Sequence, residues 1–197
     1  MVDATRDRIV TEALRLFAVR GYAGTSIGSI EEAAGLSPGS GSLYTHFDSK
    51  EAVLAAAVDR AVDLAETGFE IAPMLPLGDL RSELTLMARG SLLLLGTWGD
   101  LIRVMLKESD QFPAVMADAR ARLFDGSYRF FADWLAAKSK SGELPDTDHE
   151  AIAIVALGSI EAYWVMCNVY DNRPFGVDDD RFVEQWVTSL LRALGAR

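Results

Sequence analysis

Residues 34–54, AGLSPGSGSLYTHFDSKEAVL, place glycines and serines directly before a segment with helical spacing. Small residues at this density usually form a loop, yet Leu43 and Phe47 lie four residues apart, as on one face of a helix. One explanation is a short helix that is kept bare so that another molecule approaches its backbone closely. We expect this helix to begin with Ser37 as N-cap and Pro38 as its first residue, and to end near Phe47.

Two further helices are expected before this one. Apolar residues recur at helical spacing up to Gly21, which suits the left-handed conformation that ends a helix. A second short helix is capped by Thr25 or Ser26 and closes at Gly35. Three short helices with a glycine turn between the second and third predict a helix-turn-helix unit, in which the third helix enters the major groove of DNA.

The side chains of the predicted helix-turn-helix unit divide into two sets. The expected inward residues are Ile30, Leu36, Leu43 and Phe47, and the expected outward residues are Ser40, Ser42, Tyr44, Thr45 and His46. Hydroxyl, phenol and imidazole groups bind phosphate oxygens and base edges, so the outward set is a candidate DNA-binding surface. Two alternatives stay open at this point: Tyr44 as a half-buried core residue and His46 as a solvated surface residue.

Across residues 17–54 the chain resembles the TetR family of bacterial transcriptional regulators. The similarity runs through FAVRGYAGTSIGSIEEAAGLS and LYTHFDSKEAVL, in which many residues stand at the same spacing from one another as in the family. The resemblance implies that Ser42, Tyr44, His46 and Lys50 touch operator DNA, and that Thr25 and Ser26 form a phosphate-binding cap. Lys50 is equally compatible with a position at a helix N-terminus where it has no contact with DNA. The chain departs from the commonest family pattern by two extra residues between Ser37 and Leu43, which leaves the register of residues 38–41 on DNA open.

Charge is distributed unevenly along the 197 residues. The formal net charge is −10, which argues against a non-specific nucleic-acid coat protein, because such binding comes from Lys and Arg neutralising phosphates. The first fifty residues hold five basic and six acidic side chains, so most of the acidity lies in the second part. The single Cys167 excludes a disulfide framework and fits a reducing compartment.

Apolar residues recur at helical spacing along nearly the whole chain, and the alternating pattern of strands is absent. The sequence therefore predicts an all-α protein of about nine helices. We expect a DNA-binding domain at residues 1–48 and a ligand-binding and dimerisation domain at residues 49–197. The stretch GFEIAPMLPLGD, residues 68–79, is the clearest break. The helices expected after residue 48 span about 50–66, 80–95, 100–108, 112–139, 148–170 and 179–194, with Thr147 and Glu150 as a capping box for the fifth of these.

Large apolar side chains of the second part are candidates for the lining of an effector pocket. Aromatic walls with few polar groups suit small-molecule sites, although an aromatic stripe is more often plain core. Glu161 is an isolated charge in an apolar helix, and faces either a cationic ligand or a buried Arg partner. The candidate ligand-binding residues are Trp98, Met105, Phe130, Phe131, Trp134, Glu161, Tyr163 and Trp164.

The apolar run AIAIVALGSIEAYWVMCNVY, residues 151–170, is long enough to span a membrane. Its flanks are acidic and Glu161 interrupts it, so a buried or subunit-interface helix is favoured over a membrane span. Residues 148–170 and 179–194 therefore predict a homodimer through a four-helix bundle, an expectation that the family resemblance shares. Without a secretory signal at the N-terminus, cytoplasmic residence is expected.

An enzyme is disfavoured by the residue types present. His46 and His149 are far apart in the chain, and no Gly-rich phosphate loop or paired Glu-x-x-His motif occurs, so we expect neither a catalytic nor a metal site and no cofactor. The expected function is a ligand-responsive transcriptional regulator, a repressor released from a palindromic operator by a small molecule. The alternative is a dimeric helical ligand-binding or interaction module with weak or lost DNA binding.

Overall fold

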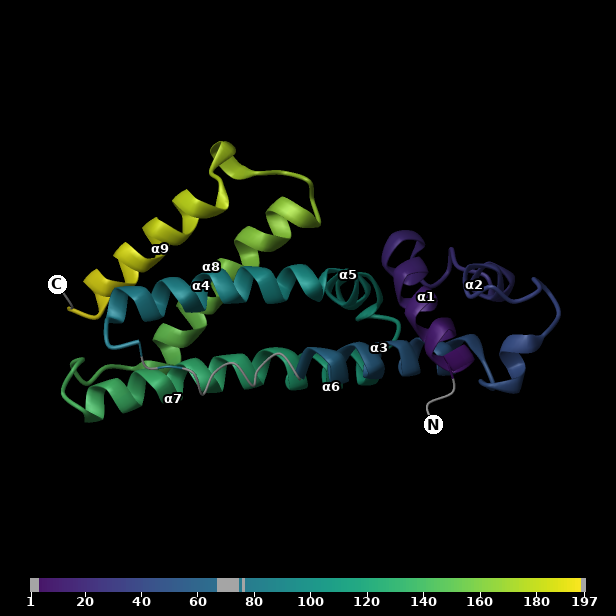
Figure 1. Cartoon of the computed structure of the whole chain (residues 1–197), viewed down its shortest axis with the longest axis horizontal. Helices are drawn as coiled ribbons and strands as arrows, with labels where there is room; N and C mark the ends of the chain where they lie inside the picture. Colours follow the sequence, from purple (N-terminus) through teal and green to yellow (C-terminus); the bar gives the residue numbers. More distant parts are fainter. Residues whose placement is uncertain (1–3, 67–74, 76, 196–197) are drawn as a thin grey trace. The chain divides into compact units, whose positions relative to one another are not determined.

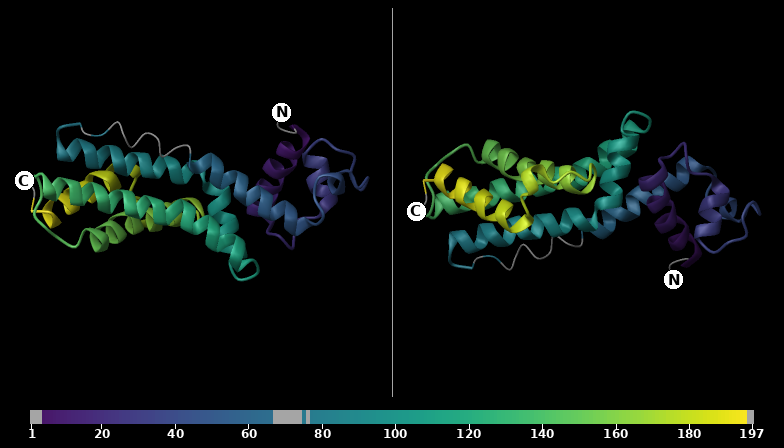
Figure 2. Two further views of the ribbon diagram at one scale, coloured as in Figure 1. Left: turned by 90° about the horizontal axis from the view of Figure 1, so that it is seen from below. Right: turned by 90° about the horizontal axis from the view of Figure 1, so that it is seen from above.

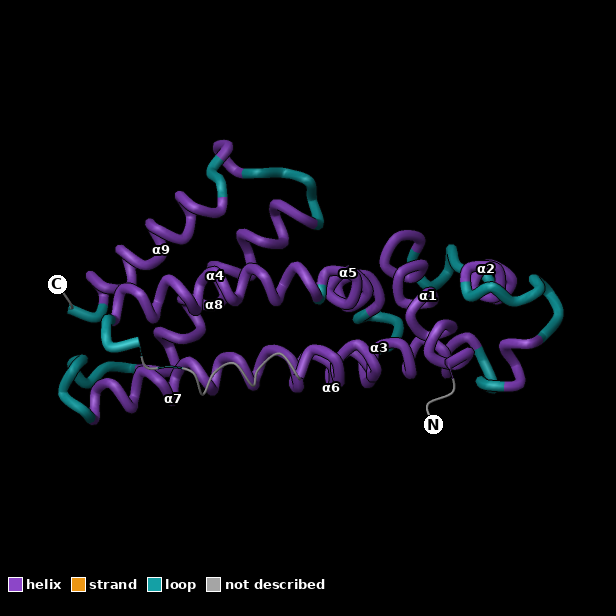
Figure 3. The backbone as a smooth tube through the Cα atoms, viewed as in Figure 1, coloured by secondary structure: helices purple, strands orange, loops and turns teal. Residues whose placement is uncertain are grey.

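The computed structural model describes residues 4–66, 75 and 77–195. These residues form helices and loops and contain no β-strand, which confirms the predicted all-α class (Figures 1 and 3). The chain packs as two units. Unit 1 combines Met1–Thr67 with Trp98–Arg122, and unit 2 combines Gly68–Thr97 with Leu123–Arg197. The predicted functional boundary after residue 48 stays a prediction, because these units report packing alone.

Unit 1 is built around its first helix. Its elements are α1 (Ala4–Arg20), α2 (Ile27–Ala33), the 3₁₀ turn η1 (Ser42–Thr45), α3 (Lys50–Glu66), α5 (Gly99–Glu108) and α6 (Pro113–Arg120). α1 packs against α2, α3 and α5, and α6 packs against α3 and α5. Ile9 and Phe17 are fully buried on the inward face of α1. Burying such a side chain stabilises the fold by about 1.5–3 kcal/mol, which is why the apolar stripe of α1 determines the packing.

The C-terminal end of α1 is held by specific contacts. Gly21 lies at φ +73° directly after α1, as expected for a glycine that ends a helix. The Lys107 ammonium of α5 donates to the carbonyl oxygens of Ala18 and Val19, two groups that lack a partner within the helix. These contacts fix where α1 stops and where the chain turns toward α2.

The predicted third helix is wrong in extent and type. Residues 38–41 form a turn followed by loop, and only the 3₁₀ turn η1 follows, at residues 42–45. Gly39 and Gly41 lie at φ +74° and +73°, a left-handed conformation that a right-handed helix cannot contain. Ser37 and Pro38 therefore begin a loop, and the helix-turn-helix unit consists of α2, this loop and η1.

The described residues of unit 2 form four long helices and a short turn. These are α4 (Leu80–Thr97), α7 (Gly126–Lys140), α8 (His149–Asn168), the 3₁₀ turn η4 (Pro174–Gly176) and α9 (Asp179–Ala193). α7 packs against α8, and α4 packs against both α8 and α9 (Figure 2). The predicted helix at residues 112–139 is divided into α6 and α7 by the π-helical segment Ala121–Asp125. Most of the predicted break at residues 68–79 lies outside the described residues.

The start of α8 differs from the predicted capping box. Asp148 is the N-cap, and its carboxylate accepts a hydrogen bond from the Ala151 amide at 3.0 Å. The Thr147 hydroxyl is buried without a hydrogen-bond partner, so the predicted Thr147–Glu150 box does not form. Asp is as good an N-cap as Thr, and here it is placed one residue closer to the helix.

Within the described part of the chain, α8 is the one helix long and apolar enough to cross a membrane. Only a third of its apolar window is buried. Ile154 and Val155 are 60% and 73% exposed on its surface. Length and composition of this kind also occur in core and interface helices of soluble proteins, so they are weak evidence for a membrane span.

Candidate DNA-binding site

The predicted division of the helix-turn-helix side chains is largely confirmed. Ile30 and Leu43 are fully buried and Phe47 is 5% exposed, whereas Leu36 is only half-buried. Tyr44 is 56% exposed, which excludes its placement as a core residue. Ser40 and Thr45 are exposed, and Ser42 and His46 are half-buried. The site is therefore a small polar surface that is supported from below by apolar side chains.

The loop before η1 is ordered by its own polar groups. The hydroxyls of Ser40 and Ser42 lie 2.5 Å apart and share a hydrogen bond. The Thr45 hydroxyl donates to the Ser42 carbonyl at 2.7 Å, inside the 3₁₀ turn. Gly39 and Gly41 have open space where a Cβ atom would lie, with only the Tyr44 ring at 4.0 Å from the Gly41 position. Another molecule can approach the backbone at these glycines.

Glu31 holds this loop from inside the domain, and the sequence analysis missed it. Its side chain is fully buried in α2. One carboxylate oxygen accepts from the Gly39 amide at 2.7 Å and the other from the Leu43 amide at 3.1 Å. In the sequence Glu31 resembles its neighbour Glu32, which is exposed. Only the helical phase relative to Ile30 and Ala34 would have indicated an inward position.

Two predicted DNA-contacting residues, Lys50 and Thr25, make contacts within the domain. The Lys50 ammonium donates to the carbonyls of Tyr22 and Thr25, at 2.7 and 2.8 Å, and lies 4.0 Å from the centre of the Tyr22 ring. Thr25 is 1% exposed and its hydroxyl donates to the Gly21 carbonyl. A buried hydroxyl with an internal partner does not present itself to a phosphate, so the predicted side-chain contact of Thr25 is not supported.

Ser26 is the N-cap of α2. Its hydroxyl accepts from the Ser29 amide at 3.1 Å, and the Ser29 hydroxyl accepts from the Ser26 amide at 3.1 Å. This reciprocal pairing is a capping box with Ser in place of the usual Glu. Ser26 is exposed, unlike Thr25, so of the two predicted cap residues it is the one available to a phosphate.

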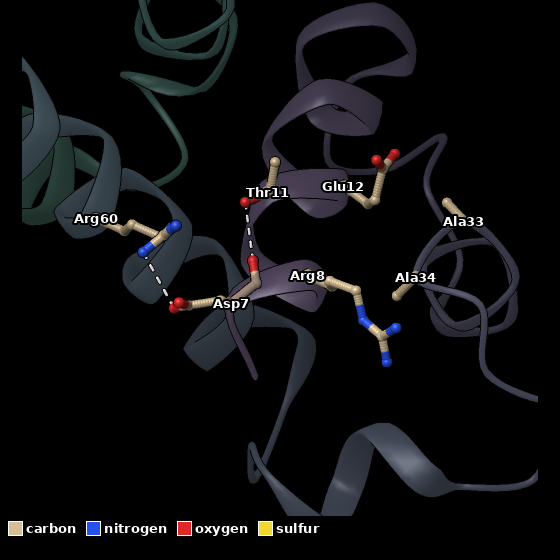
Figure 4. Close-up of a pocket in the computed structure, with 7 residues that line it drawn as sticks. All are labelled: Asp7, Arg8, Thr11, Glu12, Ala33, Ala34 and Arg60. Carbon is tan, nitrogen blue, oxygen red and sulfur yellow. Dashed lines mark hydrogen bonds and ion pairs between the residues drawn. The ribbon is translucent and has the colours of Figure 1, made fainter. Parts of the chain in front are cut away.

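A recess of about 230 Å³ lies between α1, the end of α2 and α3 (Figure 4). Arg60 reaches across it from α3 and bonds the Asp7 carboxylate at 3.0 Å. Arg8 extends along the same recess toward Ala34 (Figure 4). The pairing of Arg60 with Asp7 ties α3 to α1, and the mixed charge of the walls makes the recess a poor pocket for an apolar ligand.

Arg122 connects α3 to the end of α6. Its guanidinium bonds Asp59 at 2.9 Å, Asp63 at 2.5 Å and Glu66 at 2.7 Å. Hydrogen bonding to Arg122 lowers the pKa of the Glu66 carboxyl, and the same bonds raise the pKa of Arg122. These carboxylates recur every turn along one face of α3, so a single cation at the π-helical segment holds that face in place.

The predicted effector residues are divided between the two units. Trp98 and Met105 are buried in unit 1, at 7% and 8% exposure. On α7, Phe131 stacks on Trp134 with ring centres 5.7 Å apart and also approaches Trp186, so it belongs to the core of unit 2. Phe130 is half-buried on the same helix.

Glu161 has a partner that was not expected. The Tyr128 hydroxyl donates to its carboxylate at 2.7 Å, where an Arg or a cationic ligand was predicted. Burial raises the pKa of the Glu161 carboxyl, and the bond from Tyr128 opposes this shift. Burial likewise raises the pKa of Tyr128. The contact joins α7 to α8 and accounts for a charge in an apolar helix without a ligand.

Tyr163 and Trp164 line a cavity of about 480 Å³ between α4, α8 and α9. Its walls combine apolar Leu92 and Val183 with the polar Arg89 and further groups. The Tyr163 hydroxyl donates to the Asp179 carboxylate at 2.7 Å and accepts from Arg173 at 2.9 Å. The bond from Tyr163 lowers the pKa of Asp179.

A groove of about 580 Å³ runs between α8 and α9. Its walls are mainly apolar and include Ile152 and Val155 of α8 and Phe182 and Leu190 of α9. Trp186 forms part of the floor, and its indole N–H donates to the Ala156 carbonyl at 2.9 Å. None of the predicted effector residues is among those that line the groove.

Residues 9–57 match the family model described as bacterial regulatory proteins, tetR family. Residues 92–196 match the model described as AefR-like transcriptional repressor, C-terminal domain, which covers more than half of the chain. The HTH-type transcriptional regulator YerO of Bacillus subtilis is 38% identical over 64 residues, which are 32% of this chain and 22% of that protein.

Solved structures share the fold over nearly the whole chain. A TetR-family regulator from Cytophaga hutchinsonii is 24% identical with a TM-score of 0.71, covering 98% of this chain and 95% of the other. AibR, solved in complex with isovaleryl coenzyme A and operator DNA, is 21% identical with a TM-score of 0.68, covering 93% and 96%. Members of this family bind operator DNA and small-molecule effectors. Together with the family models, these similarities establish that the chain belongs to the TetR family of bacterial transcriptional regulators and carries an AefR-like C-terminal domain.

Proposed function

We propose that this chain is a cytoplasmic, homodimeric repressor that leaves a palindromic operator when a small molecule binds. The observation that carries the DNA-binding part is the exposed polar surface of η1 and its preceding loop, supported by a fully buried Leu43. Ser40, Ser42, Tyr44, Thr45 and His46 are the proposed contacts to bases and phosphates. Ser26 is the proposed phosphate contact of α2, while Lys50 and Thr25 support the domain from within.

Dimerisation through α8 and α9 is the second part of the proposal. Ile154 and Val155 are strongly exposed, and the groove beside them is mainly apolar. Covering such a surface with the same helices of a second copy gives an isologous interface, in which one patch meets itself. Residues 148–170 and 179–194 then form a four-helix bundle, as predicted from the sequence. Two η1 units about 34–36 Å apart read successive major grooves.

The third part is an effector site in unit 2. The cavity between α4, α8 and α9 offers apolar walls with a few polar groups, the composition that small-molecule sites share. Tyr163 and Trp164 are the predicted residues best placed to contact an effector there. AibR was solved with isovaleryl coenzyme A, so a molecule with a short apolar group is a reasonable first probe.

Effector and operator are linked through their different preferences for two states of the dimer. A ligand that favours a dimer with the wrong η1 separation lowers DNA affinity, typically through a coupling of about 1–3 kcal/mol. The helix of residues 50–66, α3, carries the change to the DNA-binding surface. A ligand that saturates the protein and leaves operator affinity unaltered would exclude this mechanism.

The decisive experiment measures DNA binding directly. A random duplex library is enriched on the wild-type protein, and the affinity of the enriched duplex is compared with that of a scrambled duplex by fluorescence anisotropy. We expect preference for a palindromic sequence and a stoichiometry of one dimer per site. Equal affinity for both duplexes at every salt concentration would refute the proposal.

One observation favours the alternative of a helical ligand-binding module with weak DNA binding. The first fifty residues hold more acidic than basic side chains. We therefore expect a shallow salt dependence, with a slope of log K against log salt no steeper than about −8, since each neutralised phosphate contributes roughly −0.9. Ligand binding without any detectable DNA affinity at low salt would favour the alternative. Recovery in the soluble fraction without detergent tests the alternative that α8 spans a membrane.

A further inference from the structure

The feature that the proposed function leaves unused is the buried carboxylate of Glu31. Glutamate is almost never fully buried unless it is paired, because removing a charge from water is costly. Glu31 has zero exposed surface, and its recorded partners are two main-chain amides of the loop in front of η1. A carboxylate that accepts from backbone N–H groups forms charge-assisted bonds, which are stronger than bonds between neutral groups.

The two amides lie on either side of the proposed DNA-contacting loop. Gly39 precedes Ser40, and Leu43 follows Ser42, so the carboxylate bridges the three residues between them. Between these points the backbone turns through Gly41 at φ +73° and cannot use helical hydrogen bonds. Without Glu31, the Leu43 amide would be a buried donor without its partner, which is unfavourable because the amide has given up its hydrogen bond to water.

Only one type of side chain satisfies this geometry. Both partners of Glu31 are donors, so both side-chain oxygens must be acceptors. Glutamine has the same shape, but its amide group would present N–H toward one of the two backbone N–H groups. Aspartate keeps both oxygens on a chain that is shorter by one carbon. The site therefore requires the length and the charge of glutamate together.

We propose that Glu31 is a positioning residue for DNA recognition, which sets the register of Ser40, Ser42 and Tyr44 on the major groove. The inference rests on the proposed DNA-binding function. The loop has two more residues between Ser37 and Leu43 than the commonest family pattern, and Glu31 supplies the hydrogen-bond acceptors that the longer backbone needs. Glu31 itself lies under the surface and does not touch DNA.

The test compares Glu31→Gln with the matched control Glu32→Gln. Both variants lose one negative charge from the same turn of α2, but Glu32 is exposed. We expect Glu31→Gln to weaken binding of the enriched duplex at least about tenfold, because misplaced base contacts are lost, while binding of the scrambled duplex changes less than about twofold. Glu32→Gln should leave the ratio of the two affinities at the wild-type value.

Two further readouts separate positioning from simple stability. Amide hydrogen exchange of Gly39 and Leu43, followed by NMR, should accelerate in Glu31→Gln while the amides of α1 and α8 keep their protection. A partly unfolded variant would instead lose affinity for both duplexes in equal proportion. If Glu31→Gln does not fold, Glu31→Asp replaces it, since that variant keeps the charge and shortens the reach, and the same loss of preference is expected.

The outcomes distinguish this inference from the proposed function. A wild-type chain that shows no preference between the duplexes would overturn the proposed function and this inference with it. A wild-type chain with clear preference, alongside Glu31 variants of equal preference, would overturn the inference alone. Unchanged exchange of the Gly39 and Leu43 amides in Glu31→Gln would also contradict it.

Discussion

Lys50 gives the sharpest distinction between a residue that contacts DNA and one that holds the fold. Its ammonium donates to the carbonyls of Tyr22 and Thr25 and lies over the Tyr22 ring at 4.0 Å. Lys50→Met keeps most of the side-chain volume and removes the charge. We expect this substitution to destabilise the α1–α2 connection and to leave the salt dependence of DNA binding unchanged.

The magnitude follows from the three contacts. A hydrogen bond from a charged donor contributes about 1.5–3 kcal/mol, and a cation–π contact at a partly exposed site contributes about 0.5–1 kcal/mol. The bonds share one ammonium and the residue is half-buried, so the total falls below their sum. A loss of about 2–4 kcal/mol lowers the melting temperature of a chain of this size by about 5–15 °C.

Two measurements on the same samples decide the role of Lys50. Thermal unfolding followed by circular dichroism, at one protein concentration, gives the stability change. The slope of log K against log salt for the enriched duplex gives the number of phosphate contacts. Lys140→Met is the matched control, because Lys140 is exposed on α7 and loses the same charge. A nearly unchanged melting temperature together with a slope shallower by about 0.9 would refute our assignment.

Three further predictions concern other parts of the molecule. Arg122 lowers the pKa of the Glu66 carboxyl below its ordinary value of 4.5, so their pairing stabilises the fold above that pH and is lost as the pH falls through the lowered pKa. Arg122→Gln should therefore lower the melting temperature near neutral pH, and the melting temperature of the variant should fall less than that of the wild type as the pH is lowered. Melting temperatures of the two proteins that vary identically with pH would count against this. Gly41→Ala places a side chain at φ +73° and should cost about 1–2 kcal/mol in chemical denaturation; an unchanged denaturation midpoint would contradict the left-handed conformation. Val155→Arg puts a charge on the exposed face of α8 and should yield monomers in light scattering, whereas a persistent dimer would exclude that face as the interface.

Periodicity in the sequence determined which residues of the helix-turn-helix unit are buried. Ile30, Leu43 and Phe47 were expected inside and Tyr44 outside, and the structure agrees. The same pattern placed α4, α8 and α9 within one or two residues of their ends, but it did not separate α7 from α6. These features follow from local geometry, because the period of a helix determines which side chains of the sequence lie on the same face.

The tertiary structure decided the partners of the polar groups. Glu31 reaches Gly39 and Leu43 across a loop, in the place where the sequence predicted a third helix. Lys50 finds carbonyls 25 and 28 residues away, and Glu161 finds Tyr128 instead of an arginine. The partner of a buried polar side chain cannot be predicted from the sequence alone. Any donor or acceptor that lies close enough lowers the free-energy cost of burying the group. Which group comes near is determined only when the helices pack.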